Sequence, residues 1–368
     1  MKILMINTVP TERNGITGVI MNIIRTINHE DIQIDLLSIN EPDKNYVTLL
    51  KEYGGDVYTI SRCIKKPLCY IKNVSRLIKK NKYDIVHSHG NSHTLALDLF
   101  AAWLGGCKIR IAHSHSTSCL YQTVHKLLTP LFNSCYTDGI ACSKEAGKWL
   151  FGERRFDIIN NGIDTKHFEF NEKFREQIRK KYNINEKNIV LGNIGDFHST
   201  NKNQQFLVEL IKDLHEQDTK YHLLLIGEGC LRKNIMEDVQ SMGCSDFIHF
   251  TGEISEVNKY LSAMDFFLLP SKFEGLPLTA VEAQANGLQC FLSDRISESV
   301  DLTGNVYFFT LENEEIWKKA IINNKKTNSR KNVSRQACVD ICDNDYDLKE
   351  ECDKLKKMYC NLMKRDRL

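Results

Sequence analysis

Long uninterrupted apolar runs are missing from this 368-residue sequence. The run at the N-terminus, residues 1–7, reaches polar residues too soon for a signal peptide. No later stretch is long enough to cross a bilayer as a helix. We therefore expect a cytoplasmic protein.

A strong excess of charge of one sign is also missing. The chain has 49 Lys and Arg against 47 Asp and Glu, which gives a net charge of +2. Such a balance provides no overall attraction to nucleic acid, so any charged partner must meet a local patch. With 42% apolar and 26% charged residues over 368 positions, the composition is typical of a globular protein with two domains.

Paired cysteine motifs are absent, although cysteine itself is frequent, with 13 residues. The number is odd, and most positions lie in apolar runs, as Cys142 and Cys290 do. The closest pair, Cys338 and Cys342, lies one helical turn apart without a second pair of ligands nearby. We predict buried, reduced thiols, no disulfide and no metal site.

The sequence does contain a regular alternation of short apolar runs with amphipathic segments of helix length. The runs predicted to be buried strands are residues 2–7, 32–39, 57–60, 85–87, 109–112, 139–142 and 157–159, and then 189–195, 221–227, 247–250, 265–269 and 289–292. This alternation predicts β-α-β crossovers and parallel sheets. The fold class is therefore α/β, with two Rossmann-like domains.

The alternation lapses over residues 164–185, where charge is dense. We place the domain boundary there, with an N-terminal domain over residues 1–164 and a C-terminal domain over residues 165–346. The cleft between two such domains is the expected active site. Ligands of doubly wound sheets bind beyond the carboxyl ends of the strands, so the loops that follow the apolar runs carry most information.

One of these loops, residues 270–277, precedes a predicted helix from Leu278 through Asn286. Amides at a helix N-terminus suit a phosphate, and Gly275 would allow its close approach. Glu274 and Glu282 bracket the turn, and because carboxylates repel phosphate, both are expected to bond hydroxyls of sugars. Two glutamates at this spacing are common by chance, but Glu282 stands among small apolar residues, where an unpaired charge is costly.

This segment resembles the signature of the retaining glycosyltransferases of family 4 (group 1), which include exopolysaccharide and capsule enzymes and have the GT-B fold. The resemblance implies that Glu274 contacts donor-sugar hydroxyls at the catalytic centre and that Glu282 holds the ribose. It also implies that the backbone at Gly275, Leu276 and Leu278 meets the distal phosphate. Residues 160–164 resemble the family's interdomain signature, and a C-terminal helix over about 347–368 is expected to join the N-terminal domain.

The same family carries an arginine and then a lysine in the loop that corresponds to residues 192–203. Lys202 matches the phosphate-binding lysine, and Asn203 follows it. Asp196 stands at the arginine position, which is expected to weaken diphosphate binding unless another base such as Lys272 compensates. A solvated surface lysine is the alternative interpretation of Lys202.

Two further loops match those that surround the nucleoside in similar enzymes. Gly227 and Gly229 follow one predicted strand, and Ile254 follows the next and would pack on the base. Simple strand-to-helix turns are the alternative. In the N-terminal half, Gly15 and Gly18 match a glycine-containing loop beneath the donor phosphates, although a plain flexible loop would look the same.

Two His-x-His pairs end predicted strands, at His87 and His89 and at His113 and His115. Such pairs suit a metal, but no carboxylate or cysteine set completes a zinc site, and we predict none. The resemblance places the catalytic histidine at His115, with His113 as the alternative. In that role His115 would bond the donor sugar and the diphosphate.

Residues 62–82 contain eight Lys or Arg and no acid, interleaved with apolar residues. A basic amphipathic helix of this kind suits an anionic membrane surface, and a solvated helix face is the alternative. Aromatic residues are too few here to favour nucleic acid. A membrane patch would suit the lipid-linked saccharide acceptors of similar enzymes, at the inner face of the cell membrane.

The resemblance therefore implies retaining transfer of a hexose or N-acetylhexosamine from a UDP-linked donor, without metal or other cofactor. Two alternatives stay open. A non-hydrolysing UDP-sugar epimerase of the same fold would act without an acceptor. A degenerate nucleotide-sugar-binding subunit would lack activity, and Asp196 is the residue that keeps this alternative open.

Overall fold

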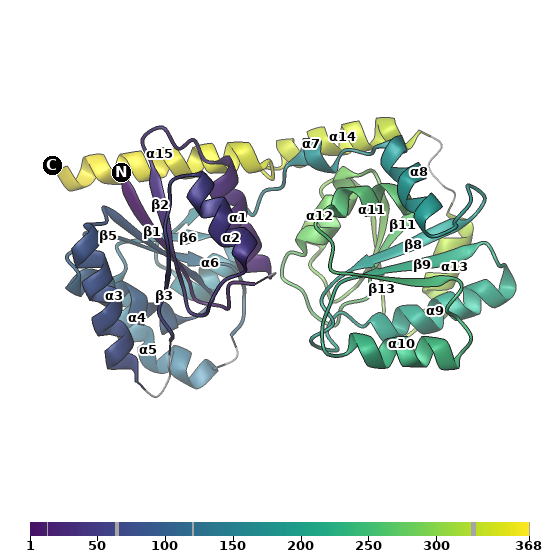
Figure 1. Ribbon diagram of the computed structural model, residues 1–368, viewed down its shortest axis with the longest axis horizontal. Coiled ribbons are helices and arrows are strands. Elements are labelled where there is room, and N and C mark those ends of the chain that lie inside the picture. Colours follow the sequence, from purple (N-terminus) through teal and green to yellow (C-terminus); the bar gives the residue numbers. More distant parts are fainter. Residues whose placement is uncertain (13, 63–65, 120, 325–328, 368) are drawn as a thin grey trace. The chain divides into compact units, whose positions relative to one another are not determined.

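The structure is a computed structural model that describes residues 1–12, 14–62, 66–119, 121–324 and 329–367. The chain forms two compact units. Unit 1 comprises Met1–Gly162 and Leu348–Leu368, and unit 2 comprises Ile163–Asp347. Each unit is a parallel sheet with helices on both faces (Figure 1), so the predicted α/β class is confirmed.

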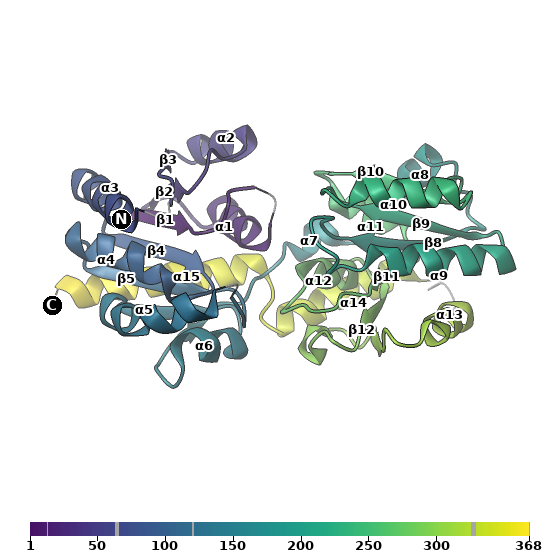
Figure 2. The same ribbon diagram turned by 90° about the horizontal axis from the view of Figure 1, so that it is seen from below.

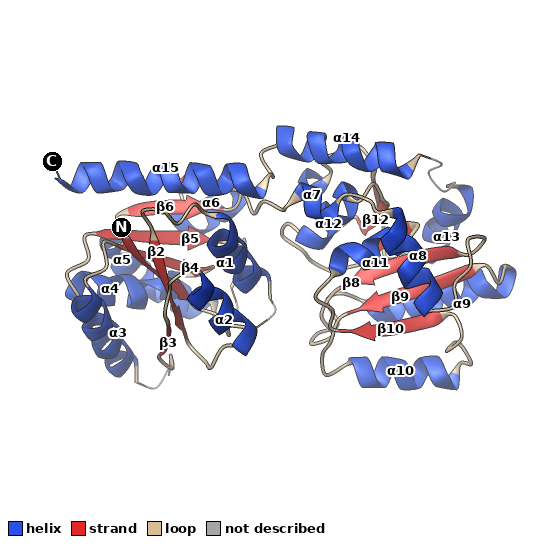
Figure 3. Cartoon of the chain, turned by 45° about the horizontal axis from the view of Figure 1, so that its top comes forward, coloured by secondary structure: helices blue, strands red, loops and turns tan. Residues whose placement is uncertain are grey.

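Unit 1 contains a seven-stranded sheet in the order β3-β2-β1-β4-β5-β6-β7. Its strands are β1 (Lys2–Asn7), β2 (Gln33–Ser38), β3 (Val57–Thr59), β4 (Ile85–Gly90), β5 (Ile109–Ser114), β6 (Asp138–Ala141) and β7 (Asp157–Ile158). Its helices are α1 (Gly15–Thr26), α2 (Lys44–Glu52), α3 (Pro67–Asn81), α4 (Ala96–Leu104), α5 (Gln122–Cys135), α6 (Lys144–Phe151) and α15 (Leu348–Arg367), with the short 3-10 helix η1 (His93–Leu95). Helices α3, α4 and α5 cover one face of the sheet, and α1 and α15 pack together on the other (Figure 3).

Unit 2 contains a six-stranded sheet in the order β10-β9-β8-β11-β12-β13. Its strands are β8 (Ile189–Ile194), β9 (Tyr221–Ile226), β10 (Ile248–Gly252), β11 (Phe266–Leu269), β12 (Gln289–Ser293) and β13 (Val306–Phe309). Its helices are α7 (Thr165–Phe168), α8 (Glu172–Lys181), α9 (Gln204–Gln217), α10 (Arg232–Ser241), α11 (Val257–Ala263), α12 (Leu278–Ala285), α13 (Glu314–Asn323) and α14 (Arg330–Asp343), with η2 (Glu298–Val300). The apolar faces of α9, α10 and α13 pack on one side of the sheet, and those of α8, α11, α12 and α14 on the other (Figure 2).

The edge strands differ from the sequence prediction. Residues 157–159 were expected to be a buried strand, but β7 has only two residues and both are exposed. Strand β13 was not predicted, and only Val306 of its four residues is buried. Both strands pair on one side only, so they need fewer apolar residues than a central strand does.

The charged segment that predicted a break between domains is in fact packed into unit 2. Helix α8 begins after Asn171, whose side chain accepts the backbone N–H groups of the first turn. Arg175 and Arg179 of α8 each lie 3.0 Å from the carboxylate of Asp265, and the Arg179 side chain is buried. A buried carboxylate needs such partners, which explains why two helical arginines point inward.

The cysteines in the described ranges are free thiols, and only half of them are buried. Cys69 and Cys230 are exposed, contrary to the prediction of buried thiols. Cys338 and Cys342 lie on α14, where the Cys338 thiol donates to the carbonyl of Thr165. Among the described residues, no helix combines the length and apolar character that a membrane span requires.

Candidate functional site

The loops that follow β8, β9, β10 and β11 of unit 2 are joined to one another through their backbones. The N–H of Phe197 donates to the carbonyl of Glu228 at 2.8 Å, and the N–H of Lys272 donates to the carbonyl of Asn201 at 2.8 Å. These loops therefore form one continuous rim at the carboxyl edge of the sheet, where such folds bind ligands. We call residues 195–203, 227–231, 252–254 and 270–277 the unit 2 rim.

The predicted residues Gly227 and Gly229 have a packing reason to be glycine. Their φ angles are 142° and 154°. A Cβ on Gly227 would lie 2.0 Å from the carbonyl oxygen of Gly195, and one on Gly229 would lie 2.2 Å from the carbonyl carbon of Phe197. Only glycine lets the two loops approach so closely. The side chain of Ile254, also on the rim, is partly buried against the core.

Lys202 and Glu274 are brought together at the rim. The Lys202 Nζ lies 2.7 Å from the Glu274 Oε1, and the two side chains are 16% and 15% exposed. The stem of Lys202 crosses Gly195, where a Cβ would come within 3.0 Å of the lysine Cγ. Asn203 adopts the left-handed conformation, with φ of 56°, and starts α9. The family resemblance implies separate roles for Lys202 and Glu274, and the sequence did not predict that they are in contact.

The N-terminus of α12 carries unsatisfied polar groups. Pro277 at the N-cap provides no side-chain acceptor for the first N–H groups. The hydroxyls of Ser271 and Thr279 are buried and have no hydrogen-bond partner among the described residues. Such groups suit an anion or hydroxyl that is bound there.

The three predicted residues of the turn differ in what they offer to a ligand. A Cβ on Gly275 would meet no atom within 4 Å, so the packing of the protein alone does not demand glycine. The side chains of Leu276 and Leu278 pack on the core of unit 2. Only the backbone of these two residues is therefore available to a phosphate.

Glu282 lies one turn inside α12 and is half-buried as a residue. Burial of the carboxyl raises its pKa to about 8. No hydrogen bond or ion pair to its carboxyl occurs among the described residues. A ligand that donates hydroxyl hydrogens would satisfy this group, in keeping with the predicted ribose contact.

Asp196, which stands where the family resemblance places an arginine, is exposed and serves its own loop. Its Oδ1 accepts the N–H of His198 at 3.1 Å, and its carbonyl accepts from Gln204 Nε2 at 2.9 Å. Lys272, the proposed compensating base, is exposed and forms no ion pair within the described residues. The carboxylate of Asp196 therefore stabilises a turn.

Gly15 and Gly18 of unit 1 lie in helix α1 and not in a loop, contrary to the prediction. Asn14 caps this helix by accepting the N–H of Thr17, and the N–H of Gly18 donates to the carbonyl of Asn14. A Cβ on either glycine would meet nothing within 4 Å. The cap at Asn14 starts the helix at Gly15, four residues before the end of the predicted loop at Gly18 would allow.

Four histidines lie together: His87 and His89 on β4, His113 near the end of β5 and His115 directly after it. His87 Nε2 is 3.1 Å from His113 Nδ1, and His89 Nδ1 is 3.0 Å from His115 Nε2. Burial lowers the pKa of all four, to about 3 for His87 and about 4 for His115, so the rings are uncharged at neutral pH. One ring nitrogen from each of His87, His89 and His113 lies within 4.8 Å of the other two. The sequence did not predict this cluster, because it contains neither a carboxylate nor a cysteine.

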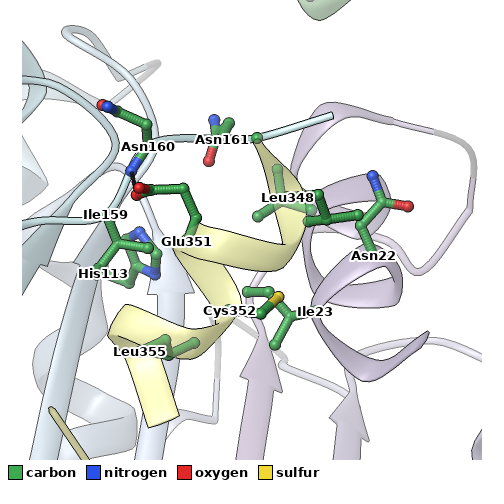
Figure 4. A pocket seen from close by; sticks show the side chains of 12 residues that line it. Asn22, Ile23, His113, Ile159, Asn160, Asn161, Leu348, Glu351, Cys352 and Leu355 are labelled. Carbon is green, nitrogen blue, oxygen red and sulfur yellow. Dashed lines mark hydrogen bonds between the residues drawn. The ribbon is translucent and has the colours of Figure 1, made fainter. Parts of the chain in front are cut away.

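A small pocket adjoins this cluster, between the start of α15 and the end of β5 (Figure 4). His113, Asn160, Asn161 and Glu351 line it. The Glu351 Oε2 accepts the N–H of Asn160 at 2.6 Å. The Asn161 side chain acts on His115 and raises its pKa, against the larger effect of burial. Neither Asn161 nor Glu351 was predicted as a site residue.

The basic segment 62–82 is exposed only in part. Residues 63–65 lie outside the described residues. The Arg62 Nη2 lies 3.4 Å from the buried carboxylate of Asp98, so this side chain points inward. The exposed basic residues of α3 are Lys72, Arg76, Lys79 and Lys80, opposite the buried face of the helix.

Comparisons with known proteins match both units to one family. Residues 13–167 match the model described as Glycosyltransferase Family 4, and residues 174–337 match the model described as Glycosyl transferases group 1. The glycosyltransferase EpsF of Bacillus subtilis is 31% identical over 302 residues, which cover 78% of each chain. An Escherichia coli enzyme named UDP-Gal:alpha-D-GlcNAc-diphosphoundecaprenol alpha-1,3-galactosyltransferase is 26% identical over 305 residues, also 78% of each chain.

The solved structures include one of similar fold over nearly the whole chain. HepE of Anabaena, in complex with UDP-glucose, matches with a TM-score of 0.78 at 17% identity, and the match covers 98% of this chain and 100% of HepE. This likeness and the two parallel sheets confirm the predicted GT-B fold of two Rossmann-like units.

Proposed function

The chain belongs to the family 4 (group 1) glycosyltransferases, and on that premise we propose that it transfers a sugar from a UDP-linked donor to a lipid-linked saccharide in cell-surface polysaccharide synthesis. The donor sugar is a hexose or N-acetylhexosamine. The named activity of the E. coli relative, which uses UDP-galactose and a diphosphoundecaprenol-linked acceptor, supports this choice of substrates. The single observation that carries the donor site is the Lys202–Glu274 pair beside the uncapped N-terminus of α12.

The roles of the rim residues follow from their chemistry. Lys202 and the first amides of α12 neutralise the diphosphate, because a cation and a helix N-terminus both attract phosphate. Glu274 accepts hydrogen bonds from sugar hydroxyls, and Glu282 accepts them from the ribose. The loops at Gly227, Gly229 and Ile254 surround the base. Asn203 completes the lysine loop.

Transfer proceeds with retention of the anomeric configuration. The bond between the sugar C1 and the phosphate oxygen breaks, and the acceptor oxygen bonds to C1 on the same face. The departing phosphate takes the proton of the acceptor hydroxyl, so no carboxylate base is needed. Lys202, the amides of α12 and His115 stabilise the negative charge that develops on the diphosphate. The reaction requires no metal or other cofactor.

The protein acts in the cytoplasm, at the inner face of the cell membrane. The exposed Lys72, Arg76, Lys79 and Lys80 of α3 provide a cationic surface for anionic lipids. Such a surface would bring the enzyme to a lipid-linked acceptor. Nucleic acid is not a partner.

A donor-by-acceptor screen tests the proposal. Radiolabelled UDP-hexoses and UDP-N-acetylhexosamines are incubated with the protein and membrane extracts, and the transfer of label to lipid is measured. We expect label from one UDP-sugar, at least 100-fold less transfer in His115→Ala and Glu282→Ala, and near-normal transfer in the controls His29→Ala and Glu237→Ala. Normal turnover in both site variants with folding intact would refute the assignment of the site. Coupling constants of the product's anomeric proton report retention.

A further inference from the structure

A line of buried rings links helix α15 to the end of β5. The Tyr359 hydroxyl lies 2.6 Å from His87 Nδ1, and His87 Nε2 lies 3.1 Å from His113 Nδ1. Tyr359, His87 and His113 are all buried. The tyrosine comes 272 positions after the histidine that it contacts. The line ends at His113 Nε2, which is buried and has no hydrogen-bond partner among the described residues.

The direction of these hydrogen bonds follows from the tyrosine. Among the described residues, His87 Nδ1 is the one partner of the Tyr359 hydroxyl. A buried O–H without an acceptor is costly, whereas an oxygen without a donor is less so, and the hydroxyl therefore donates to His87 Nδ1. The uncharged His87 must then carry its single hydrogen on Nε2 and donate it to His113 Nδ1. The uncharged His113 in turn carries its hydrogen on Nε2.

The second histidine pair has no such anchor. His89 Nδ1 and His115 Nε2 share one hydrogen bond of 3.0 Å. The outer nitrogens, His89 Nε2 and His115 Nδ1, have no hydrogen-bond partner among the described residues. The neighbour at the outer end of this pair is the Asn161 side chain, which acts on His115 and raises its pKa, and not a tyrosine hydroxyl. The rings of His113 and His115 lie next to each other, with centroids 4.1 Å apart.

We propose that Tyr359 is a positioning residue: its hydroxyl fixes His87, and through His87 also His113, as Nε2–H tautomers, so that His113 presents an N–H donor. The recipient is an oxygen acceptor in the pocket lined by Asn160, Asn161 and Glu351. The Asn161 Oδ1 is itself buried and accepts no hydrogen bond of normal geometry among the described residues, although the Asn161 side chain lies near enough to His115 to raise its pKa. A water or a substrate hydroxyl that accepts from His113 and donates to Asn161 would satisfy both groups. Asn161 lies beside His115, so the tyrosine sets the surroundings of the proposed catalytic histidine.

A metal ion on His87, His89 and His113 is the competing arrangement, because one nitrogen of each lies within 4.8 Å of the others. A metal needs a lone pair on every ligand nitrogen. The tyrosine places hydrogens on both Nε2 atoms of His87 and His113. Within the part of the chain that the structure describes, the cluster consists of histidines alone, so no carboxylate in it balances a buried dication. The proposed tautomers and a resident metal on these rings are therefore incompatible.

The tautomers can be read directly in the full chain. Long-range ¹H–¹⁵N spectra of protein labelled with ¹⁵N-histidine distinguish Nε2–H from Nδ1–H, and His87→Gln and His113→Gln assign the signals. We expect both rings to be Nε2–H in the wild type. In Tyr359→Phe we expect an Nδ1–H population at both rings, because a buried hydrogen bond is worth roughly a three- to tenfold change in their ratio.

The matched control is Tyr83→Phe, which removes another buried hydroxyl of unit 1, one that donates to Asp35 Oδ2 at 2.6 Å. Both rings should stay Nε2–H in this variant. An Nδ1–H signal from His113 in the wild type, or unchanged rings in Tyr359→Phe, would overturn the proposal. If Tyr359→Phe does not fold, the wild-type spectrum alone decides. Zn²⁺ titration is the second test: equimolar binding that His87→Gln abolishes would also overturn it.

The kinetic consequence rests on the proposed function. With the donor and acceptor found by the transfer screen, Tyr359→Phe should lower kcat severalfold and leave KM for the donor within about twofold, whereas Tyr83→Phe should change neither. A Tyr359→Phe enzyme with normal kcat would refute the link to His115. Failure of transfer in the wild type would refute the proposed function and leave the spectroscopic result untouched.

Discussion

Removal of the Glu274 charge is expected to strengthen the binding of UDP while it weakens transfer. In the free protein Lys202 Nζ lies 2.7 Å from Glu274 Oε1, and both side chains are largely buried. With an effective dielectric constant of about 20, two charges at this distance attract by about 6 kcal/mol before solvation is counted. Desolvation of both groups offsets most of this, which leaves a net contribution of about 1 kcal/mol.

A diphosphate that binds to Lys202 must first break the Lys202–Glu274 ion pair, and its binding free energy is reduced by this contribution. Glu274→Gln keeps the size of the side chain and removes the charge, so we expect UDP affinity to rise about fivefold, the equivalent of about 1 kcal/mol. Lys202→Met should lower the affinity at least tenfold. The double variant should bind no better than Lys202→Met, because no cation is left to release. Isothermal titration with UDP measures all three.

The control is a second ion pair of unit 2 with the same separation. Lys259 Nζ lies 2.7 Å from Glu256 Oε1, outside the rim. Glu256→Gln should leave UDP affinity unchanged. Glu274→Gln should still lose transfer, since the amide is a poorer acceptor for sugar hydroxyls. If Glu274→Gln weakens UDP binding as much as Lys202→Met does, the proposed competition between carboxylate and phosphate is wrong.

Three further predictions concern the rim and the helix α12 that follows it. Gly229→Ala should destabilise unit 2 by about 3 kcal/mol or more in urea unfolding, because its Cβ would lie 2.2 Å from a backbone carbon. The control Gly243→Ala should cost only about 1 kcal/mol, because Gly243 has a φ of 71° but open space around its Cβ position. Glu282 has a raised pKa of about 8, so the folded state binds more protons than the unfolded state and stability falls as pH rises from about 4.5 to 8. The difference in melting temperature between Glu282→Gln and the wild type should therefore grow in favour of the variant as the pH rises from about 4.5 to 8. A difference that does not change with pH would contradict the raised pKa. Asp196→Asn keeps the acceptor of the turn and should raise UDP affinity about twofold in the same titration, whereas Asp196→Ala should not.

The sequence was sufficient for the central strands because their burial on both faces demands continuous apolar runs. Residues 2–7 and 221–227 were assigned within one residue of β1 and β9 for this reason. The edge strands β7 and β13 pair on one side and carry mixed residues, so apolar periodicity could not identify them. The prediction starts helix α1 too late, because two closely spaced glycines are typical of a loop, whereas the side chain of Asn14 caps a helix that includes both of them.

Contacts of the candidate site were harder to predict than its residues. Lys202 and Glu274 each follow a strand, which the alternation shows, but their ion pair depends on loop paths that no local pattern encodes. The contact of Tyr359 with His87 depends on how α15 packs on the sheet of unit 1. A tyrosine in an amphipathic helix is ordinarily a core residue, so the sequence carried no signal for its hydroxyl.

Asp196 shows why a lost motif residue need not mean a lost site. Its carboxylate is exposed and accepts the N–H of His198, so water and the turn already stabilise its charge. An exposed charge is screened, and its repulsion of a nearby diphosphate is expected to be below about 1 kcal/mol. Lys202 is far less exposed, and its attraction for the diphosphate is correspondingly stronger. The balance at this rim therefore favours binding even without the arginine, provided that the phosphate can displace Glu274 from Lys202.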